Sequence, residues 1–333
     1  MSGGVDSTVV AYLLQQKGYE IEGVYMKLHD NEAYHAKNIK NIKKVSKYLG
    51  INYHILDIQK EFKEWVFDPF VKTYEIGETP NPCIVCNRNI KLGKLIEFTK
   101  KMGFDTLATG HYVKVEDGFI SEAKDESKDQ SYFLSNIKIE ALKSVIFPLG
   151  NMLKSEVREI ANSIDILQSI AKQKESSEIC FVPGSYLDIL KDYYEVKKEG
   201  VVVDCDKNPI GKHFGYMRYT IGQRKGFRVD VAHEPHYVTH IDAKNNQITV
   251  GTKDKLYKDS FKVRDLNLFI DMDKELECAV KIRYRSPKVL CKILKDGDGI
   301  VVKLDLSLAG IAPSQVAAFY IDNHIIGSGI IQL

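Results

Sequence analysis

The chain has 333 residues, of which 44% are hydrophobic and 28% are charged, and its formal net charge is +2. This length predicts about two or three domains with cores of their own, and the composition is ordinary for a globular protein. No run of about 18 apolar residues occurs, which excludes a transmembrane helix, and no signal peptide precedes the first motif, so we expect a cytoplasmic protein. Six cysteines are too few for a disulfide scaffold in a chain this long.

A glycine loop at residues 2–7 runs directly into a helical pattern at residues 8–17. Glycines let the backbone turn its N–H groups inward, and the helix presents its positive end to an anion. Ser2 and Ser7 can add hydroxyl donors, and Asp6 could hold a magnesium ion or a ribose. The loop lacks the Gly-Lys-Ser/Thr ending of a Walker A motif, so we expect a different mode of phosphate binding.

Helical and strand patterns alternate along the first half of the chain, which predicts a mostly parallel sheet with helices on both faces. We expect helices over residues 8–17, 34–49, 90–102 and 155–164, and strands over residues 21–26, 53–57 and 106–110. A glycine loop of this type should follow the first strand of its sheet. Met1 alone precedes Ser2, so we expect that strand to be encoded upstream or to be missing.

The pattern changes near residue 200 to short β-like runs separated by Gly, Asn and Asp turns. The later runs have the spacing of a small β-barrel. The expected strands cover residues 200–203, 236–241, 247–250, 279–284, 288–294, 300–304, 316–321 and 325–331.

Two prolines stiffen the loop before Cys83 and Cys86, and we expect a helix to begin just beyond Cys86. A thiol near a helix N-terminus, with Arg88 and Lys91 close by, should ionise readily and could attack an electrophile or another sulfur. One alternative is half of a zinc site, which would need two more ligands. The other is a thioredoxin-type redox pair.

Four further cysteines lie outside this motif. Taken alone, Cys180 favours a buried structural role. Cys205, Cys278 and Cys291 lie in β-like runs, and we assign them to packing.

Basic residues are concentrated between Cys205 and Asp230, with aromatic residues among them. Such a mixture can pair with phosphates and stack on unpaired bases, as RNA recognition requires. The overall charge is close to neutral, so RNA binding would depend on local patches of this kind. Lysines at 37, 40, 44 and 47 fall near one helical face, where a solvated surface is the commoner explanation and RNA contact the alternative.

Several motifs follow one another in a fixed order. They are Ser-Gly-Gly-Val-Asp-Ser at 2–7, Met-Lys at 26–27, Asn-Pro-Cys-x-x-Cys-Asn at 81–87, Ala-Thr-Gly-His-Tyr at 108–112, Lys-Asp-Gln-Ser-Tyr-Phe-Leu at 128–134, Ile-Cys-Phe at 179–181, Ile-Gly-Gln-Arg-Lys-Gly at 221–226, Glu-Pro-His-Tyr-Val at 234–238, Arg-Tyr-Arg at 283–285 and Pro-Ser-Gln at 313–315. Together they resemble the tRNA-specific 2-thiouridylases, which are PP-loop ATP pyrophosphatases. The resemblance implies an α/β fold with a Rossmann-like parallel sheet of the PP-loop (HUP) type over residues 1–178. A small, mostly-β tRNA-contact domain over 179–257 and a C-terminal β-barrel over 258–333 would follow.

The resemblance also implies a reaction. Such an enzyme uses ATP with Mg²⁺ to adenylate O2 of the wobble uridine of tRNA and replaces that oxygen by sulfur, giving 2-thiouridine, AMP and pyrophosphate. Cys180 would carry the sulfur as a persulfide, Cys86 would be the nucleophile, and a transient Cys86–Cys180 disulfide would remain. The sulfur donor would be a cysteine desulfurase or a relay protein. We expect no permanently bound cofactor, no protein metal site and no membrane partner.

Site residues are implied by the same resemblance. The ATP site would comprise Ser2, Gly3, Gly4, Val5, Asp6, Ser7, Met26 and Gly110. The target base would touch Asn81, Pro82 and Cys83. The tRNA would touch His111, Lys128, Asp129, Gln130, Arg283, Tyr284 and Gln315. From the residues alone, 128–130 would be an ordinary polar turn, His111 a satisfied buried histidine and 283–285 an exposed strand face.

Three positions depart from the family's pattern, and one of them is the tryptophan expected near His236, which is absent. Cys83 stands where many relatives carry aspartate, and residues 28–30 replace the usual Asn-Trp. Three other functions stay open from the sequence. They are a different PP-loop ligase, a truncated relative that binds tRNA or carries sulfur without catalysis, and a zinc-binding structural module.

Overall fold

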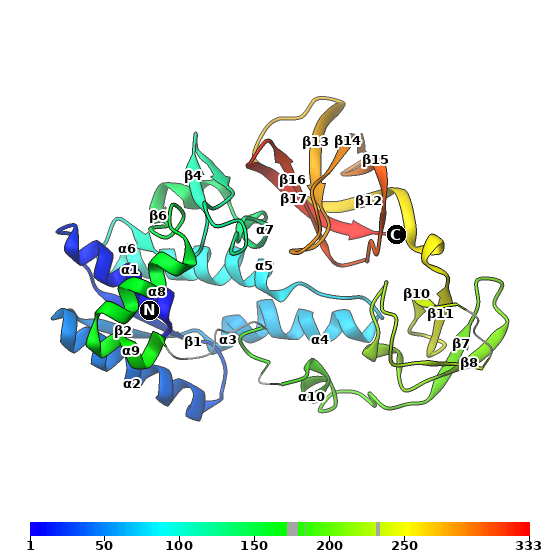
Figure 1. Ribbon diagram of the computed structural model, residues 1–333, viewed down its shortest axis with the longest axis horizontal. Coiled ribbons are helices and arrows are strands. Elements are labelled where there is room, and N and C mark those ends of the chain that lie inside the picture. The colour runs from blue at the N-terminus through cyan, green and yellow to red at the C-terminus, as the bar shows by residue number, and fades with distance from the viewer. Residues whose placement is uncertain (172–178, 183, 231–233) are drawn as a thin grey trace. The chain divides into compact units, whose positions relative to one another are not determined.

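A computed structural model describes residues 1–171, 179–182, 184–230 and 234–333 (Figure 1). The chain forms two compact units, which are described separately. The first comprises Met1–Val66, Cys83–Glu178 and Asn323–Ile325, and the second comprises Phe67–Pro82, Ile179–Asp322 and Ile326–Leu333. The expected boundary at residue 178 lies outside the described residues.

The first unit contains parallel strand pairs, as predicted. Strand β1 (Gly23–Lys27) pairs with β2 (Tyr53–Asp57), and β3 (Leu107–Ala108) pairs with β6 (Val145–Ile146). The amino group of Met1 donates to the backbone oxygen of Val24, so the start of the chain lies against β1.

Helices pack around these strands. They are α1 (Val5–Gln16), α2 (Glu32–Leu49), α8 (Lys154–Ser163) and α9 (Asp165–Ala171). Figure 1 shows α8 and α9 beside α1 and α2, although more than a hundred residues separate the two pairs in sequence. The buried side chains of α1 include Val9, Val10 and Leu14, which gives the first predicted helix its core.

Helical structure dominates residues 59–101. Helix α3 (Gln59–Phe62) passes through a π-helical stretch (Lys63–Phe67) into α4 (Asp68–Glu75). Helix α5 (Pro82–Cys86) continues through another π-helical stretch (Asn87–Lys94) into α6 (Leu95–Lys101). The sequence predicted only the last of these helices. Within the described residues, no helix combines the length and the apolar character needed to cross a bilayer.

Shorter elements complete the first unit. Strands β4 (Lys114–Glu116) and β5 (Phe119–Ser121) form a hairpin, and His324 pairs with Ser121 at its edge. Helix α7 (Ser131–Leu134) precedes a 3₁₀-helix (Ile139–Ser144). These elements carry the 108–112 and 128–134 motifs into the interior of the unit.

The second unit contains α10 (Tyr186–Leu190) and a mixed sheet. Its strand order is β10-β11-β7-β8-β9, and β11 and β7 run parallel. The bounds are β7 (Gly200–Val203), β8 (Pro209–His213), β9 (Arg228–Val229), β10 (Tyr237–Asp242) and β11 (Gln247–Gly251). Helix α4 belongs to this unit, where Phe70 and Tyr74 join Leu190 and Met217 in one core.

The C-terminal strands form the predicted β-barrel. Their order is β12-β15-β14-β13-β16-β17, and β12 pairs with β17 to close the ring. The bounds are β12 (Tyr257–Leu268), β13 (Glu275–Lys281), β14 (Val289–Asp296), β15 (Gly299–Ala309), β16 (Val316–Ile321) and β17 (His324–Gln332). Closure leaves no open edge in the ring, and inward residues such as Phe319 and Val302 are fully buried.

Phe319→Ala should lower the free energy of unfolding by ~3–5 kcal/mol, because it empties a packed site in the barrel core. Leu306→Ala in the same barrel should change it by less than ~0.5 kcal/mol, since Leu306 is 72% exposed. Urea denaturation followed by circular dichroism measures both. Equal losses for the two variants would contradict the barrel interior described here.

Candidate active site

The glycine loop is closed by its own hydroxyl groups. The backbone N–H of Ser2 donates to Ser7 Oγ at 3.0 Å, and Ser7 Oγ donates to the backbone oxygen of Gly4 at 3.2 Å. Thr8 Oγ1 donates to the same oxygen at 2.9 Å. These contacts fix the loop's curvature without using the N–H groups of the first turn of α1.

Gly3 brings the loop against α2. Its φ is +82°, and a Cβ built there would lie 3.1 Å from the backbone oxygen of Asn38, so glycine is required on both counts. Asn41 Nδ2 donates to the backbone oxygen of Gly3 at 3.3 Å. Among the described residues, no side chain caps α1 at Gly4, and an anion can therefore bind the first-turn N–H groups.

Asp6, in the first turn of α1, joins a partly buried contact. Its Oδ1 accepts from Lys154 Nζ at 2.6 Å and from the Tyr112 hydroxyl at 2.9 Å. The Lys154 side chain is 9% exposed and that of Asp6 is 34% exposed. Lys154 Nζ also lies 5.3 Å from the centre of the Tyr112 ring. Asp6, Lys154 and Tyr112 therefore form one cluster of charged and aromatic side chains at the glycine loop.

Met26 lies near the carboxyl end of β1 and Gly110 lies just after that of β3, which is where ligands bind in open α/β sheets. A Cβ at Gly110 would lie 3.1 Å from Asp6 Cβ and 3.2 Å from the backbone nitrogen of Ser7. Any larger residue would push the loop away. The structure thus brings Gly110 against the glycine loop and places the half-buried Met26 at the end of β1.

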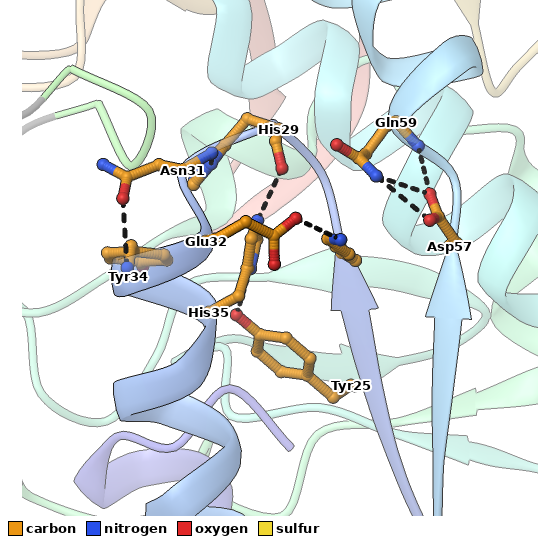
Figure 2. Close-up of polar contacts among 9 residues, drawn as sticks. Tyr25, His29, Asn31, Glu32, Tyr34, His35, Asp57 and Gln59 are labelled. Atoms are coloured by element: carbon orange, nitrogen blue, oxygen red, sulfur yellow. Dashed lines mark hydrogen bonds and ion pairs between the residues drawn. The ribbon is translucent and has the colours of Figure 1, made fainter.

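A histidine cluster follows β1, at the position where the sequence departs from the family's Asn-Trp. Figure 2 shows His35 between the Tyr25 hydroxyl, 2.6 Å from its Nδ1, and the backbone oxygen of His29, 2.7 Å from its Nε2. A carbonyl only accepts, so the Nε2–H group of His35 donates to the His29 oxygen. Burial raises the pKa of Tyr25 to about 12. The His29 ring packs on Tyr34 and His35, and burial lowers its pKa.

Cys83 and Cys86 lie in α5, the start of a helical run that ends at Lys101. We expected this helix to begin beyond Cys86, and that prediction was wrong. Pro82 takes the first helical position, where its fixed φ and its missing N–H are tolerated. Cys83 therefore lies in the first turn and is half-buried, whereas Cys86 lies further in and is 5% exposed. The helix N-terminus acts on Cys83 more than on Cys86.

The residues after Cys86 anchor the helix to the rest of the first unit. Arg88 Nη1 donates to the backbone oxygen of Asn136 at 2.8 Å and to its Oδ1 at 2.5 Å. Asn87 Nδ2 donates to the backbone oxygen of Phe133 at 2.9 Å. Arg88, which we expected to act on the thiol, thus positions the cysteine helix.

Cys180 lies in an exposed turn of the second unit, and Cys86 belongs to the first. Its exposure contradicts the buried structural role that the sequence favoured for it alone. The motif residues 175–178 just before it lie outside the described residues. The structure therefore describes the two proposed reaction cysteines in separate units.

The remaining cysteines divide into two kinds. Cys278 and Cys291 face each other in the barrel core with their Sγ atoms 3.6 Å apart, which confirms packing. Cys205 lies in an exposed turn after β7, so its assignment to packing was wrong. Within the described ranges, no group of three or more His, Cys, Asp or Glu side chains is arranged to hold a metal ion.

The turn at residues 128–130 is tied to the segment around Tyr112. Asp129 is buried, and its carboxylate accepts from Ser131 Oγ at 2.7 Å. Gln130 Oε1 accepts from the backbone N–H of Tyr112, and the Gln130 N–H donates to the Tyr112 oxygen, both at 2.9 Å. Tyr112 also donates to the Asp6 carboxylate, so this one residue contacts both the glycine loop and the turn predicted to bind tRNA.

His111 is buried, with Nδ1 2.9 Å from Thr109 Oγ1 and its ring edge-on to Phe147. Burial, and next the charge of Lys91, lowers its pKa well below the usual value. His111 is therefore neutral at pH 7. This environment fits the satisfied buried histidine that the residues alone suggested, and its contact with tRNA stays a prediction.

Three predicted tRNA residues belong to the second unit. Arg283 and Tyr284 lie between β13 and β14, and Arg283 Nη2 donates to the backbone oxygen of Ile221 at 3.0 Å. Tyr284 is half-buried. Gln315 is 9% exposed, and its Nε2 donates to two backbone carbonyls of its own unit. Their contacts with tRNA also stay predictions.

Comparison with known proteins covers nearly the whole chain. Three successive family models match, described as tRNA methyl transferase HUP domain over residues 1–184, tRNA methyl transferase PRC-barrel domain over 187–252 and Aminomethyltransferase beta-barrel domain over 258–331. Proteins named tRNA-specific 2-thiouridylase MnmA are similar to it. That of Campylobacter lari is 53% identical over 99% of this chain and 98% of the relative, and that of Nitratiruptor sp. is 54% identical over 99% and 97%. The chain belongs to the tRNA-specific 2-thiouridylase family.

Family membership confirms the predicted order of a HUP-type α/β domain, a mostly-β domain and a β-barrel. It does not explain every residue that the structure brings to the loop. Lys154 and Tyr112 were not among the predicted site residues. Tyr112 ends a motif that the sequence had singled out, and Lys154 follows the Phe147–Gly150 turn before a predicted helix, so both had a local signal.

Lys154→Met should lower the free energy of unfolding by ~1–3 kcal/mol, because Asp6 would keep its charge and lose its cationic partner. The value lies below that of a fully buried pair, since part of Asp6 is exposed to solvent. Lys124→Met is the matched control, because Lys124 pairs with Glu156 in a half-exposed position. Urea denaturation should show a loss below ~1 kcal/mol for the control, and similar losses would contradict the role given to Lys154.

Lowering the pH should destabilise the protein through His111. Its folded pKa is depressed, so the stability linked to it is present above the unfolded pKa of about 6.5 and is lost as the pH falls below that value. His111→Asn should reduce the slope of unfolding free energy below this pH by up to ~1.4 kcal/mol per unit.

Urea unfolding at a series of pH values measures that slope. His29 and His213 also have pKa values lowered by burial, and they contribute to the slope that remains. His240→Asn, at an exposed position, is the control and should leave the slope unchanged. An unchanged slope in His111→Asn would show that this imidazole is not the protonating group.

Proposed function

We propose that this protein is a tRNA-uridine 2-sulfurtransferase that converts the wobble uridine of tRNA to 2-thiouridine. One observation carries the proposal. A phosphate-type glycine loop and the Asn-Pro-Cys-x-x-Cys helix occur in a chain about half identical, over nearly its whole length, to proteins named tRNA-specific 2-thiouridylase. The catalytic domain would be residues 1–178, with residues 179–257 and 258–333 binding tRNA.

The first step is activation of a poor leaving group. The uridine O2 attacks the α-phosphorus of ATP, pyrophosphate leaves, and AMP is joined to O2. The glycine loop supports this step, because the first-turn N–H groups of α1 can bind phosphate oxygens, and Ser2 and Ser7 would line the same site. The ATP site would also include Met26 and Gly110. Mg²⁺ would be held by the phosphates and by Asp6, and it would offset phosphate charge.

The second step transfers sulfur. A persulfide on Cys180 attacks C2 through its terminal sulfur, and the C2–O bond breaks as AMP leaves. Cys86 then attacks the Cys180 Sγ, the S–S bond of the persulfide breaks, and the sulfur stays on C2. A Cys86–Cys180 disulfide forms and must be reduced before the next turnover. The alternative order, in which Cys86 first releases hydrosulfide from the persulfide, gives the same products.

Recognition of tRNA would involve both units. Asn81, Pro82 and Cys83 would contact the target base, which must leave its stack to be modified. His111, Lys128, Asp129, Gln130, Arg283, Tyr284 and Gln315 remain the candidates for further tRNA contacts. Cys83 replaces an aspartate, so no carboxylate at this position could assist proton transfer. The sulfur donor would be a cysteine desulfurase or a relay protein, and the reaction would take place in the cytoplasm.

This proposal differs from the alternative functions in the group that is transferred, which here is sulfur. The family descriptions mention methyl transfer, and another PP-loop ligase would join a small molecule. Neither reaction needs Cys86 and Cys180. A non-catalytic tRNA-binding relative is not favoured, since the glycine loop keeps its closed geometry and its Gly110 contact. Release of pyrophosphate from ATP with wobble-uridine tRNA, and its absence without tRNA, distinguishes the enzyme from such a relative.

Cys86→Ser and Cys180→Ser should each reduce 2-thiouridine formation below detection, because serine can neither carry a persulfide nor form the disulfide. Binding of tRNA should change less than about twofold, since neither change removes a phosphate contact. Cys205→Ser is the matched control, because Cys205 is exposed like Cys180. Mass spectrometry of tRNA nucleosides measures the product and filter binding the affinity. Substantial thiolation by either variant would remove the assigned roles.

A further inference from the structure

Helix α2 carries a row of lysines on its exposed side. The exposed lysines of this helix are Lys37, Lys40, Lys43, Lys44 and Lys47. Four of them, at 37, 40, 44 and 47, follow the helical repeat of three and four residues, so they form one stripe along the helix. At ~1.5 Å per residue this lysine stripe is ~15 Å long.

The charge of the lysine stripe is not compensated by carboxylates. Residues 33–56 contain no Asp or Glu, and Glu32, at the start of α2, pairs with Lys27. In the described part of the chain, none of the five lysines of α2 takes part in an ion pair. Lysines three or four residues apart repel one another, and the helix dipole favours a cation only in the last turn, where Lys47 lies. The stripe therefore costs the helix stability until an anion neutralises it.

The same helix is attached to the glycine loop, and both belong to the first unit. Asn41 Nδ2 donates to the backbone oxygen of Gly3, and a Cβ at Gly3 would lie 3.1 Å from the backbone oxygen of Asn38. Lys37 and Lys40 directly precede these two asparagines in sequence. A base that reaches ATP at this loop brings the phosphates of its neighbouring nucleotides to the surface of the first unit. The lysine stripe is one part of that surface.

The composition of the exposed side of α2 favours nucleic acid over an acidic protein. Lysine is depleted from protein–protein interfaces, which depend on aromatic and aliphatic anchors, and it serves as a point charge for phosphate. Within α2, all of which the structure describes, no exposed aliphatic side chain is larger than alanine. Tyr34 lies three residues before Lys37 and Tyr48 one residue after Lys47, and they are 42% and 51% exposed. Aromatic rings beside cations suit RNA, since they can stack on unpaired bases.

We infer that the lysine stripe of α2 binds backbone phosphates of the substrate tRNA, close to the nucleotide whose base is modified. The inference rests on the proposed function, in which tRNA is the substrate, and it adds a surface to the contact residues proposed there. Each lysine that meets a phosphate releases counterions, so the stripe contributes affinity that is independent of base sequence and falls with salt. It has no part in the transfer of AMP or sulfur.

The test neutralises the stripe in the full-length protein with the triple variant Lys37→Gln, Lys40→Gln and Lys44→Gln. Glutamine has a helix propensity close to that of lysine, so the change removes charge and keeps the helix. Filter binding of an unmodified tRNA with uridine at the wobble position should show roughly tenfold weaker affinity at about 0.1 M salt. The slope of log affinity against log salt should fall by about 2 to 3. The single-turnover rate of thiolation at saturating tRNA should stay within about twofold, because no reacting group is changed.

The matched control is the triple variant Lys17→Gln, Lys100→Gln and Lys101→Gln, which removes the same charge from other exposed lysines of the first unit. Its salt slope should equal that of the wild-type protein. Arginine at 37, 40 and 44 should retain the wild-type slope, since phosphate accepts either cation. Lys44→Gln alone should lower the slope by about 0.7 to 0.9, and it decides the question if the triple variant does not fold.

Three results would overturn the inference. An unchanged salt slope in the α2 variants would make the stripe an ordinary solvated surface. An equal loss in the control would show an effect of net charge alone. Unchanged tRNA affinity with slower sulfur transfer from a cysteine desulfurase to Cys180 would assign the stripe to an acidic protein. If the wild-type protein binds tRNA but forms no 2-thiouridine, the proposed function fails, and the salt slope still decides the role of the stripe.

Discussion

The Asp6 carboxylate holds together the part of the first unit that bears the glycine loop. Its two donors, Tyr112 and Lys154, come from segments more than a hundred residues further along the chain. They draw the 110–112 motif and the start of α8 against α1, and only glycine at 110 leaves room for that approach. The Tyr112 backbone also donates to the Gln130 side chain and accepts from the Gln130 N–H, so Tyr112 connects the loop to the turn before α7.

In the second unit, neutral hydrogen bonds hold the segment at residues 75–80. A short segment with two prolines has few N–H groups of its own, so its position must be set through carbonyl oxygens and side chains. Tyr216, Thr220 and Gln315 supply the donors, from the central sheet and from the barrel. The chain then continues without a break through Pro82 into the helix of Cys83 and Cys86.

Periodic patterns predicted the parallel strands, the first helices and the barrel, because each places apolar residues on one face over several turns or strands. The π-helical stretches at Lys63–Phe67 and Asn87–Lys94 break the 3.6-residue period, which explains why that helical region was largely missed. The prolines before Cys83 indicated a loop, and Pro82 instead begins a helix. The partners of Asp6 and Gln315 could not be predicted, since contacts between distant segments leave no local pattern.

The two reaction cysteines differ in exposure, and the difference fits the steps proposed for them. Cys180 is exposed, so a separate donor protein can reach it and load it with sulfur. Cys86 is 5% exposed within a helix that Arg88 anchors to Asn136, which shields it from oxidants between turnovers. An arrangement with both thiols exposed would form the disulfide without product. On the proposed scheme, exposure suits Cys180 as the thiol that a donor loads, and burial suits Cys86 as the thiol that reacts only within the site.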